Sequence, residues 1–136
     1  MPGSPFPQTV RKLLARPNPA VITTLRPDGQ PVSVATWYLL DDGQVLVNMD
    51  ESRRRLDYIR NDRRVSLTVL AADDWYTHVS LQGRVAKLQD DHHLVDIDRL
   101  AEHYTGQPYR SRDRRRVSAW IDIDRWHEWG TAPAND

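Results

Sequence analysis

The sequence predicts an α+β protein, mainly antiparallel β, in which a small β-barrel carries short flanking helices. Three observations lead to this fold class. Most of the chain alternates apolar and polar residues, tight-turn signals separate the alternating runs, and apolar residues recur at helical spacing only over short stretches. Closure of the sheet into a barrel would also remove exposed strand edges.

The predicted strands follow one another closely. Residues 20–26 and 31–40 flank a Pro-Asp-Gly turn, and residues 44–49 follow an Asp-Asp-Gly turn, so these three strands are expected to pair in order as a meander. Within the later part of the chain, Gly83 interrupts a long alternating run and predicts a β-bulge or a close backbone approach. The later strands are expected at residues 65–70, 75–88 and 117–126.

Short helices are predicted in three places. The first covers residues 6–14 and ends before Pro17, because proline has no amide to continue the helix. A second helix is expected to begin at Ser52. The third covers residues 94–104 and ends before Gly106.

Composition narrows the class of protein. The 136 residues fit one domain, residues 1–136, and the formal net charge of zero argues against a general nucleic-acid binder. The absence of cysteine excludes disulfide scaffolds, thiolate metal sites and cysteine nucleophiles. No apolar run approaches the roughly 20 residues that span a bilayer, and the first residues lack the pattern of a secretory signal. We therefore expect a cytoplasmic protein with no membrane partner.

The strongest candidate site is the run of Ser52, Arg53, Arg54 and Arg55, at the expected start of a helix that follows a strand. Ser52 is a favoured N-cap residue, and the next backbone amides lack partners within the helix. Arginines in a first turn are unfavourable by about 0.3 to 1 kcal/mol each unless an anion binds there. The run is interpreted as a phosphate-binding site, with an ordinary solvated charge run as the alternative.

An ordered series of segments resembles a known family. The segments are Thr23–Pro31, Trp37, Val45–Asn48, Arg53, Arg55, Ile59–Val65, Val79–Val85, Ile97–Gly106 and Arg115–Val117. Together they resemble the pyridoxamine 5′-phosphate oxidase-like split-barrel superfamily, and more closely its deazaflavin branch. The resemblance implies a split barrel that forms a homodimer, with a cofactor in each of two clefts between the subunits. It also implies that reduced coenzyme F420 delivers hydride to a small organic acceptor.

The resemblance assigns cofactor-binding roles to several residues. Arg53 and Arg55, beside Ser52, would hold the cofactor phosphate. The strand that backs the ring system would contribute Val34, Ala35, Thr36, Trp37 and, from a neighbouring strand, Asn48. The partner subunit would close the cleft with Trp75, Tyr76 and His78.

Two alternatives to an F420-dependent reductase stay open: an FMN-binding pyridoxamine 5′-phosphate oxidase-like protein, and a non-catalytic flavin or deazaflavin carrier. Since the cofactor supplies hydride chemistry, no catalytic triad is expected, and the acceptor and any proton donor remain undefined. The aromatic side chains of Trp37, Trp75, Tyr76 and Tyr104 could line the cleft or could form core and dimer contacts.

Other polar clusters carry weaker expectations. Five arginines lie in the polar loop at residues 109–116, but the stacking aromatics of a single-strand binder are lacking, so no nucleic-acid partner is expected. The resemblance implies instead that this loop offers cationic surface to the anionic tail of F420. Residues 90–93 have the sequence Asp-Asp-His-His. We expect them to form the solvated start of a helix and not to bind a metal.

Overall fold

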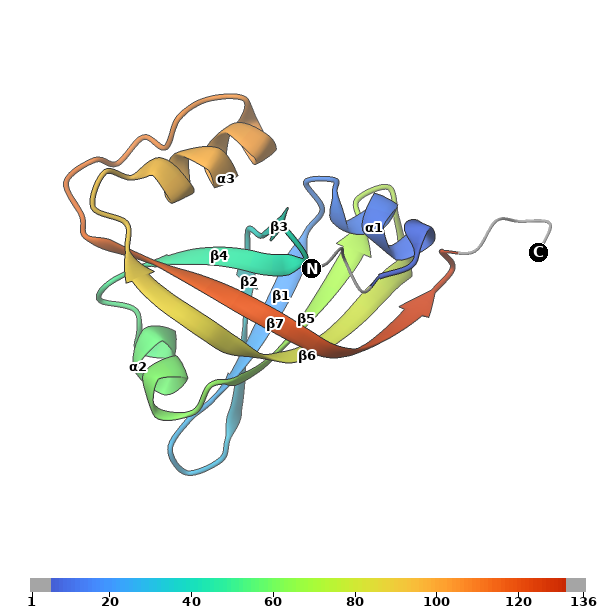
Figure 1. Cartoon of the computed structure of the whole chain (residues 1–136), viewed down its shortest axis with the longest axis horizontal. Helices are drawn as coiled ribbons and strands as arrows, with labels where there is room; N and C mark the ends of the chain where they lie inside the picture. The colour runs from blue at the N-terminus through green and yellow to red at the C-terminus, as the bar shows by residue number, and fades with distance from the viewer. Residues whose placement is uncertain (1–5, 132–136) are drawn as a thin grey trace.

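The structure, a computed structural model, describes residues 6–131. Within these residues, seven strands form one antiparallel sheet in the order β2-β1-β5-β6-β7-β4-β3, with three helices at its margins (Figure 1). The fold class is therefore confirmed as α+β with mainly antiparallel β. The strands are β1 Ala20–Leu25, β2 Pro31–Thr36, β3 Leu39–Asp41, β4 Gln44–Asp50, β5 Arg64–Ala71, β6 Asp74–Asp90 and β7 Arg116–Trp129. The helices are α1 Gln8–Leu14, α2 Arg54–Asn61 and α3 Val95–Thr105.

The two edges of the sheet are β2 and β3, and only Trp37 and Tyr38 connect them. Three peptide units span at most about 11 Å, so the sheet must curl until its opposite edges approach each other. No pairing joins β2 to β3 among residues 6–131. The result is a barrel that is split between these two strands.

The predicted meander is wrong, because residues 31–40 are not one strand. β2 pairs with β1, whereas β3 pairs with β4 at the other end of the sheet, and β4 pairs with β7. The break falls where the backbone N–H of Tyr38 donates to the Tyr104 hydroxyl (3.3 Å) and the Tyr38 hydroxyl donates to the Arg16 carbonyl (3.0 Å). Long-range contacts of a fully buried tyrosine thus override an alternating pattern that favours one strand.

The long strands β6 and β7 pair along most of their length, and the pairing register shifts at Gln82/Gly83 and again at Val85/Lys87. The first shift confirms the bulge predicted at Gly83. A Cβ added at Gly83 would lie 1.9 Å from the carbonyl oxygen of Asp122. Glycine is therefore required here by the close approach of the β7 backbone.

Strand β4 is buried on both faces, which explains its nearly continuous apolar run. Val45, Val47 and Met49 belong to the core inside the barrel, where Leu56 and Ile59 of α2 also pack. Leu46 points the other way, into a second cluster with apolar residues of α3. None of the helices within residues 6–131 combines the length and the apolar character that crossing a membrane would need.

Candidate functional site

The largest cavity lies beside α3 and has a volume of about 580 Å³, within the usual range for small-molecule sites. Arg55, Tyr109 and Arg116 also line an adjoining polar hollow of about 440 Å³. Arg55 borders a third hollow of about 500 Å³, between β2 and the start of α2. The residues around the largest cavity are Pro17, Pro19, Ala20, Ala35, Thr36, Trp37, Asn48, Arg55, Ile97, Leu100, Tyr104, Tyr109 and Arg116.

Aromatic rings form one wall of this cavity. Trp37 stacks on Tyr104 with ring centroids 5.3 Å apart and planes at 13°, and Tyr109 meets the Trp37 ring edge-on at 6.2 Å. The Tyr104 hydroxyl donates to the Asn18 carbonyl at 2.7 Å. Burial raises the pKa of Tyr104 to about 12, so its phenol stays protonated in that bond at neutral pH. Tyr104 therefore offers the cavity a flat ring rather than a free hydroxyl.

Three arginines converge where the cavity meets the two hollows: Arg53 and Arg55 at the start of α2, and Arg116 at the start of β7. Within residues 6–131, none of the three forms an ion pair, and Nε of Arg55 is buried without a hydrogen-bond partner. Burial lowers the pKa of Arg55, and the positive charges of Arg53 and Arg116 lower it further. A partly buried cation among like charges lacks the anion that would stabilise it.

Three neighbouring arginines of the 109–116 loop differ, because each pairs with a carboxylate. Arg112 pairs with Asp98 at 2.6 Å, Arg114 with Asp50 at 2.8 Å and Arg115 with Glu51 at 3.4 Å. These contacts tie the loop to α3 and to the turn before α2. The cationic surface expected for an anionic tail is therefore reduced. Among the arginines of the polar hollow, Arg114 has a carboxylate partner, whereas Arg53, Arg55 and Arg116 have none within residues 6–131.

The helix start differs in detail from the prediction for Ser52. The N-cap residue of α2 is Arg53, which makes no side-chain capping bond. Ser52 instead donates to the Asp50 carboxylate from its backbone N–H and from its hydroxyl, both at 2.8 Å. The bond from the Ser52 N–H, together with the Ser52 hydroxyl and Arg114, lowers the pKa of Asp50 to about 2. Asp50 therefore orders the turn that carries Arg53, and the amide of Ser52 is not free for a phosphate.

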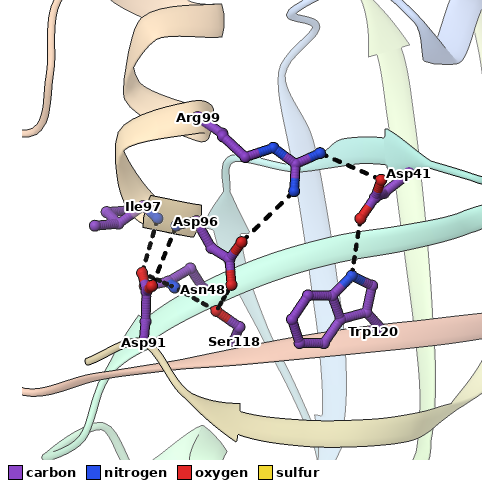
Figure 2. A network of polar contacts seen from close by, with 8 residues as sticks. All are labelled: Asp41, Asn48, Asp91, Asp96, Ile97, Arg99, Ser118 and Trp120. Carbon is purple, nitrogen blue, oxygen red and sulfur yellow. Dashed lines mark hydrogen bonds and ion pairs between the residues drawn. The ribbon is translucent and has the colours of Figure 1, made fainter. Parts of the chain in front are cut away.

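A polar network fixes α3 over the sheet (Figure 2). The Asp91 carboxylate accepts from the backbone N–H groups of Asp96 (3.1 Å) and Ile97 (2.9 Å), which caps the start of the helix. Asp91 is buried, so the expected solvated helix start is wrong for this residue, although His92 and His93 are exposed. Within the described part of the chain, no cluster of metal-ligating side chains forms.

The same network continues to the far side of α3. Arg99 pairs with Asp96 at 3.5 Å and donates to Asp41 at 3.2 Å, and Asp41 also accepts from the Trp120 indole N–H at 3.0 Å (Figure 2). The Ser118 hydroxyl donates to Asp96 at 2.7 Å. These contacts hold the apolar face of α3 against the cavity, which Ile97 and Leu100 line.

Asn48 connects this network with the arginine cluster. Its side-chain N–H₂ donates to Asp91 (3.2 Å) and to Ser118 (3.0 Å), and its side-chain oxygen accepts from Nε of Arg116 (2.8 Å). Asn48 is buried, and both ends of its amide are occupied by these partners. It therefore borders the cavity chiefly as a support for Arg116.

The structure gathers most of the sequence-predicted site residues around connected hollows. Ala35, Thr36, Trp37, Asn48 and Arg55 line the largest cavity. The predicted residues in the adjoining hollows are Val34, Ser52 and Arg53.

Three predicted residues lie elsewhere in the chain. Trp75, Tyr76 and His78 lie at the start of β6, and they line none of the hollows around Arg55. Trp75 and Tyr76 are exposed, and His78 stacks on Trp129. Their predicted role concerns the partner subunit, so it stays a prediction.

Sequence reasoning missed five cavity-lining residues, Pro17, Pro19, Ala20, Ile97 and Leu100. It also missed two residues that border both the cavity and the polar hollow, Tyr109 and Arg116. Both flank a loop in which several arginines look alike in sequence, so nothing local distinguishes Arg116 from Arg114 or Arg115. The one signal that could have indicated Arg116 was its position directly before a predicted strand, because the end of a strand places a side chain at a defined point of the fold.

Comparisons with known proteins agree with this architecture. The family model of pyridoxamine 5′-phosphate oxidase matches residues 6–130, so the chain belongs to the pyridoxamine 5′-phosphate oxidase family. Members of this family bind flavin. No curated protein matches the chain.

Solved structures show the same fold at low sequence identity. An F420 reductase has a TM-score of 0.83 at 22% identity, with 90% of this chain and 98% of that chain covered. A conserved hypothetical protein of Mycobacterium tuberculosis has a TM-score of 0.70 at 22% identity, with 96% of this chain and 89% of that chain covered. General stress protein 26 of Bacillus anthracis has a TM-score of 0.67 at 16% identity, with 90% of this chain and 92% of that chain covered.

Proposed function

We propose that this protein is a cytoplasmic F420-dependent oxidoreductase that transfers hydride between coenzyme F420 and a small organic acceptor. The observation that carries the proposal is the unneutralised cluster of Arg53, Arg55 and Arg116 beside an aromatic-walled cavity. A cofactor with a phosphate and a flat ring system fits both features. The similarity to an F420 reductase, with a TM-score of 0.83, supports the deazaflavin.

When bound, the cofactor would supply the hydride chemistry, and the protein would bind, orient and shield it. Arg53 and Arg55 would hold the phosphate by charge-assisted hydrogen bonds, and the buried Nε of Arg55 would gain the partner that it lacks. The stacked rings of Trp37 and Tyr104 would provide a flat surface beside the ring system. Ile97 and Leu100 of α3 would keep water from that surface.

FMN is the alternative cofactor, which the pyridoxamine 5′-phosphate oxidase family model favours. The two cofactors share a phosphate and a tricyclic ring, so the arginine cluster accommodates either. A carrier that binds the cofactor without turnover would use the same site.

The deciding experiment is to purify the protein under mild conditions and to identify the retained cofactor by absorbance and mass. Titration of the cofactor-free protein with F420 and with FMN, followed by fluorescence, then gives both dissociation constants. We expect tighter binding of F420 and turnover of reduced F420 with an acceptor. Preference for FMN would establish the alternative, F420 binding without turnover of any acceptor would support a carrier, and binding of neither would contradict the proposal.

We further propose that the protein is a homodimer in which the partner subunit closes the cofactor cleft with Trp75, Tyr76 and His78. Several large apolar side chains are exposed on the surface of the single chain. The exposed fraction is 74% for Trp75, 59% for Tyr76 and 40% for Val34. Single exposed apolar residues are common, but aromatic side chains are enriched at interfaces. Light scattering should therefore report twice the 15.8 kDa of one chain. A monomer that binds cofactor stoichiometrically would contradict the shared cleft.

A further inference from the structure

Arg116 differs from its neighbours in how it is held. Its Nε donates to the Asn48 side-chain oxygen at 2.8 Å, one terminal nitrogen donates to the Tyr109 hydroxyl at 3.4 Å, and its guanidinium lies 4.7 Å from the centre of the Tyr109 ring. None of these partners carries a negative charge, so the position of Arg116 is fixed while its charge stays uncompensated. Its remaining terminal nitrogen donates to no other residue within 6–131.

Arg116 comes from a different secondary-structure element than the other two arginines of the cluster. Arg53 and Arg55 come from α2, whereas Arg116 starts β7, and all three border the same polar hollow. The positive charge of Arg116 reaches Arg55, since it contributes to the lowered pKa of Arg55. An anion in this hollow would therefore be held from two separate elements of the fold.

Resting on the proposed function, we propose that Arg116 is a third ligand of the cofactor phosphate and that Asn48 is the residue that positions it. Both polar atoms of the Asn48 side chain are already bonded within the protein, the nitrogen to Asp91 and Ser118 and the oxygen to Arg116. Asn48 holds the guanidinium at Nε, so that one terminal nitrogen meets the Tyr109 hydroxyl and the other keeps no partner within residues 6–131. The bonds of Asn48 to Asp91 and Ser118 fix the amide in turn.

The first test compares Arg116→Gln with Arg115→Gln, a matched control whose side chain lines neither the cavity nor the polar hollow. Loss of a charge-assisted bond should weaken F420 and FMN binding by about ten- to a hundredfold for Arg116→Gln. Arg115→Gln should change affinity by less than about twofold, because exposed ion pairs contribute little. Unchanged affinity in a folded Arg116→Gln protein would overturn the assignment.

The second test asks whether Asn48 acts through Arg116. Asn48→Ala should weaken cofactor binding several-fold in the natural chain but should add almost nothing in the Arg116→Gln background, as coupled residues do. Gln44→Ala is the control, because Gln44 lies on the same strand and bonds Asp122 but neither Asn48 nor Arg116. Full additivity, or an equal loss of affinity from Gln44→Ala, would overturn the positioning role.

A conservative variant keeps the test decisive if Asn48→Ala does not fold. Arg116→Lys retains the charge but has no Nε for Asn48 to hold, so it should lose most of the affinity that Arg116→Gln loses. Full affinity in the lysine variant would overturn the positioning role.

Inorganic phosphate separates this proposal from the proposed function. If the protein binds neither F420 nor FMN, the function is wrong, but millimolar phosphate should still raise the melting temperature of the natural chain and of Arg115→Gln. The same phosphate should raise it much less for Arg116→Gln. Equal stabilisation of all three proteins, or of none, would overturn the three-arginine site.

Discussion

Replacement of Arg55 by methionine is expected to weaken cofactor binding by about ten- to a hundredfold or more, since each charge-assisted hydrogen bond contributes about 1.5 to 3 kcal/mol. Arg55 borders the largest cavity and both adjoining hollows, so it has the most central position of the cluster. Without cofactor, the free energy of unfolding should be unchanged or higher, because the variant removes a buried Nε without a partner and relieves repulsion from Arg53 and Arg116.

Fluorescence titration with F420 and FMN, together with urea unfolding of the cofactor-free protein, measures both parts of this expectation. Arg60→Met is the matched control, because Arg60 lies on the same helix, is exposed and lines none of the three hollows. It should leave affinity unchanged. A destabilised Arg55→Met protein that keeps its affinity would show that Arg55 serves the fold and not the ligand.

The largest effect on stability is expected for Gly83→Ala. The added methyl carbon would lie 1.9 Å from the Asp122 carbonyl oxygen, and both groups belong to paired backbones that cannot separate without disrupting β6 and β7. Overpacking of this kind costs up to about 3 kcal/mol, which corresponds to a fall in melting temperature of roughly 10 °C in a chain of this length.

Thermal unfolding of Gly83→Ala beside Gly29→Ala isolates the cause of this loss. Gly29 has a φ of +89° but nothing within 4 Å of an added Cβ, so its replacement should cost only the strain of a left-handed residue, about 1 kcal/mol. Equal losses from the two variants would mean that the close approach to Asp122 contributes nothing.

Local chemistry accounts for what could be predicted from sequence. The alternating runs around Gly83 and the short apolar repeats at helical spacing depend on neighbours in the chain, and the structure confirms these elements together with the bulge. The proximity of Arg53 and Arg55 is also local, since both belong to the start of one helix. Ser52 marks the limit of this reasoning, because Asp50, two residues earlier, takes the hydrogen bonds that would have made it a cap.

The split of residues 31–40 and the separation of Arg116 from its loop neighbours required the tertiary structure. Tyr38 leaves the strand because Tyr104 and Arg16, distant in sequence, satisfy its polar groups. Arg114 and Arg115 form ion pairs with Asp50 and Glu51, whereas Arg116 contacts the neutral side-chain oxygen of Asn48.

By itself, then, the sequence determined the fold class, the order of its elements apart from the break at Trp37 and Tyr38, and the two arginines at the start of α2. Those properties follow from patterns within short windows of the chain. Only the tertiary structure decided which cations stay without a carboxylate, because ion pairing depends on distances of about 4 Å between side chains that the fold brings together. Arg116 belongs to the site because of a contact of this kind: its Nε donates at 2.8 Å to Asn48, which lies 68 positions earlier in the sequence.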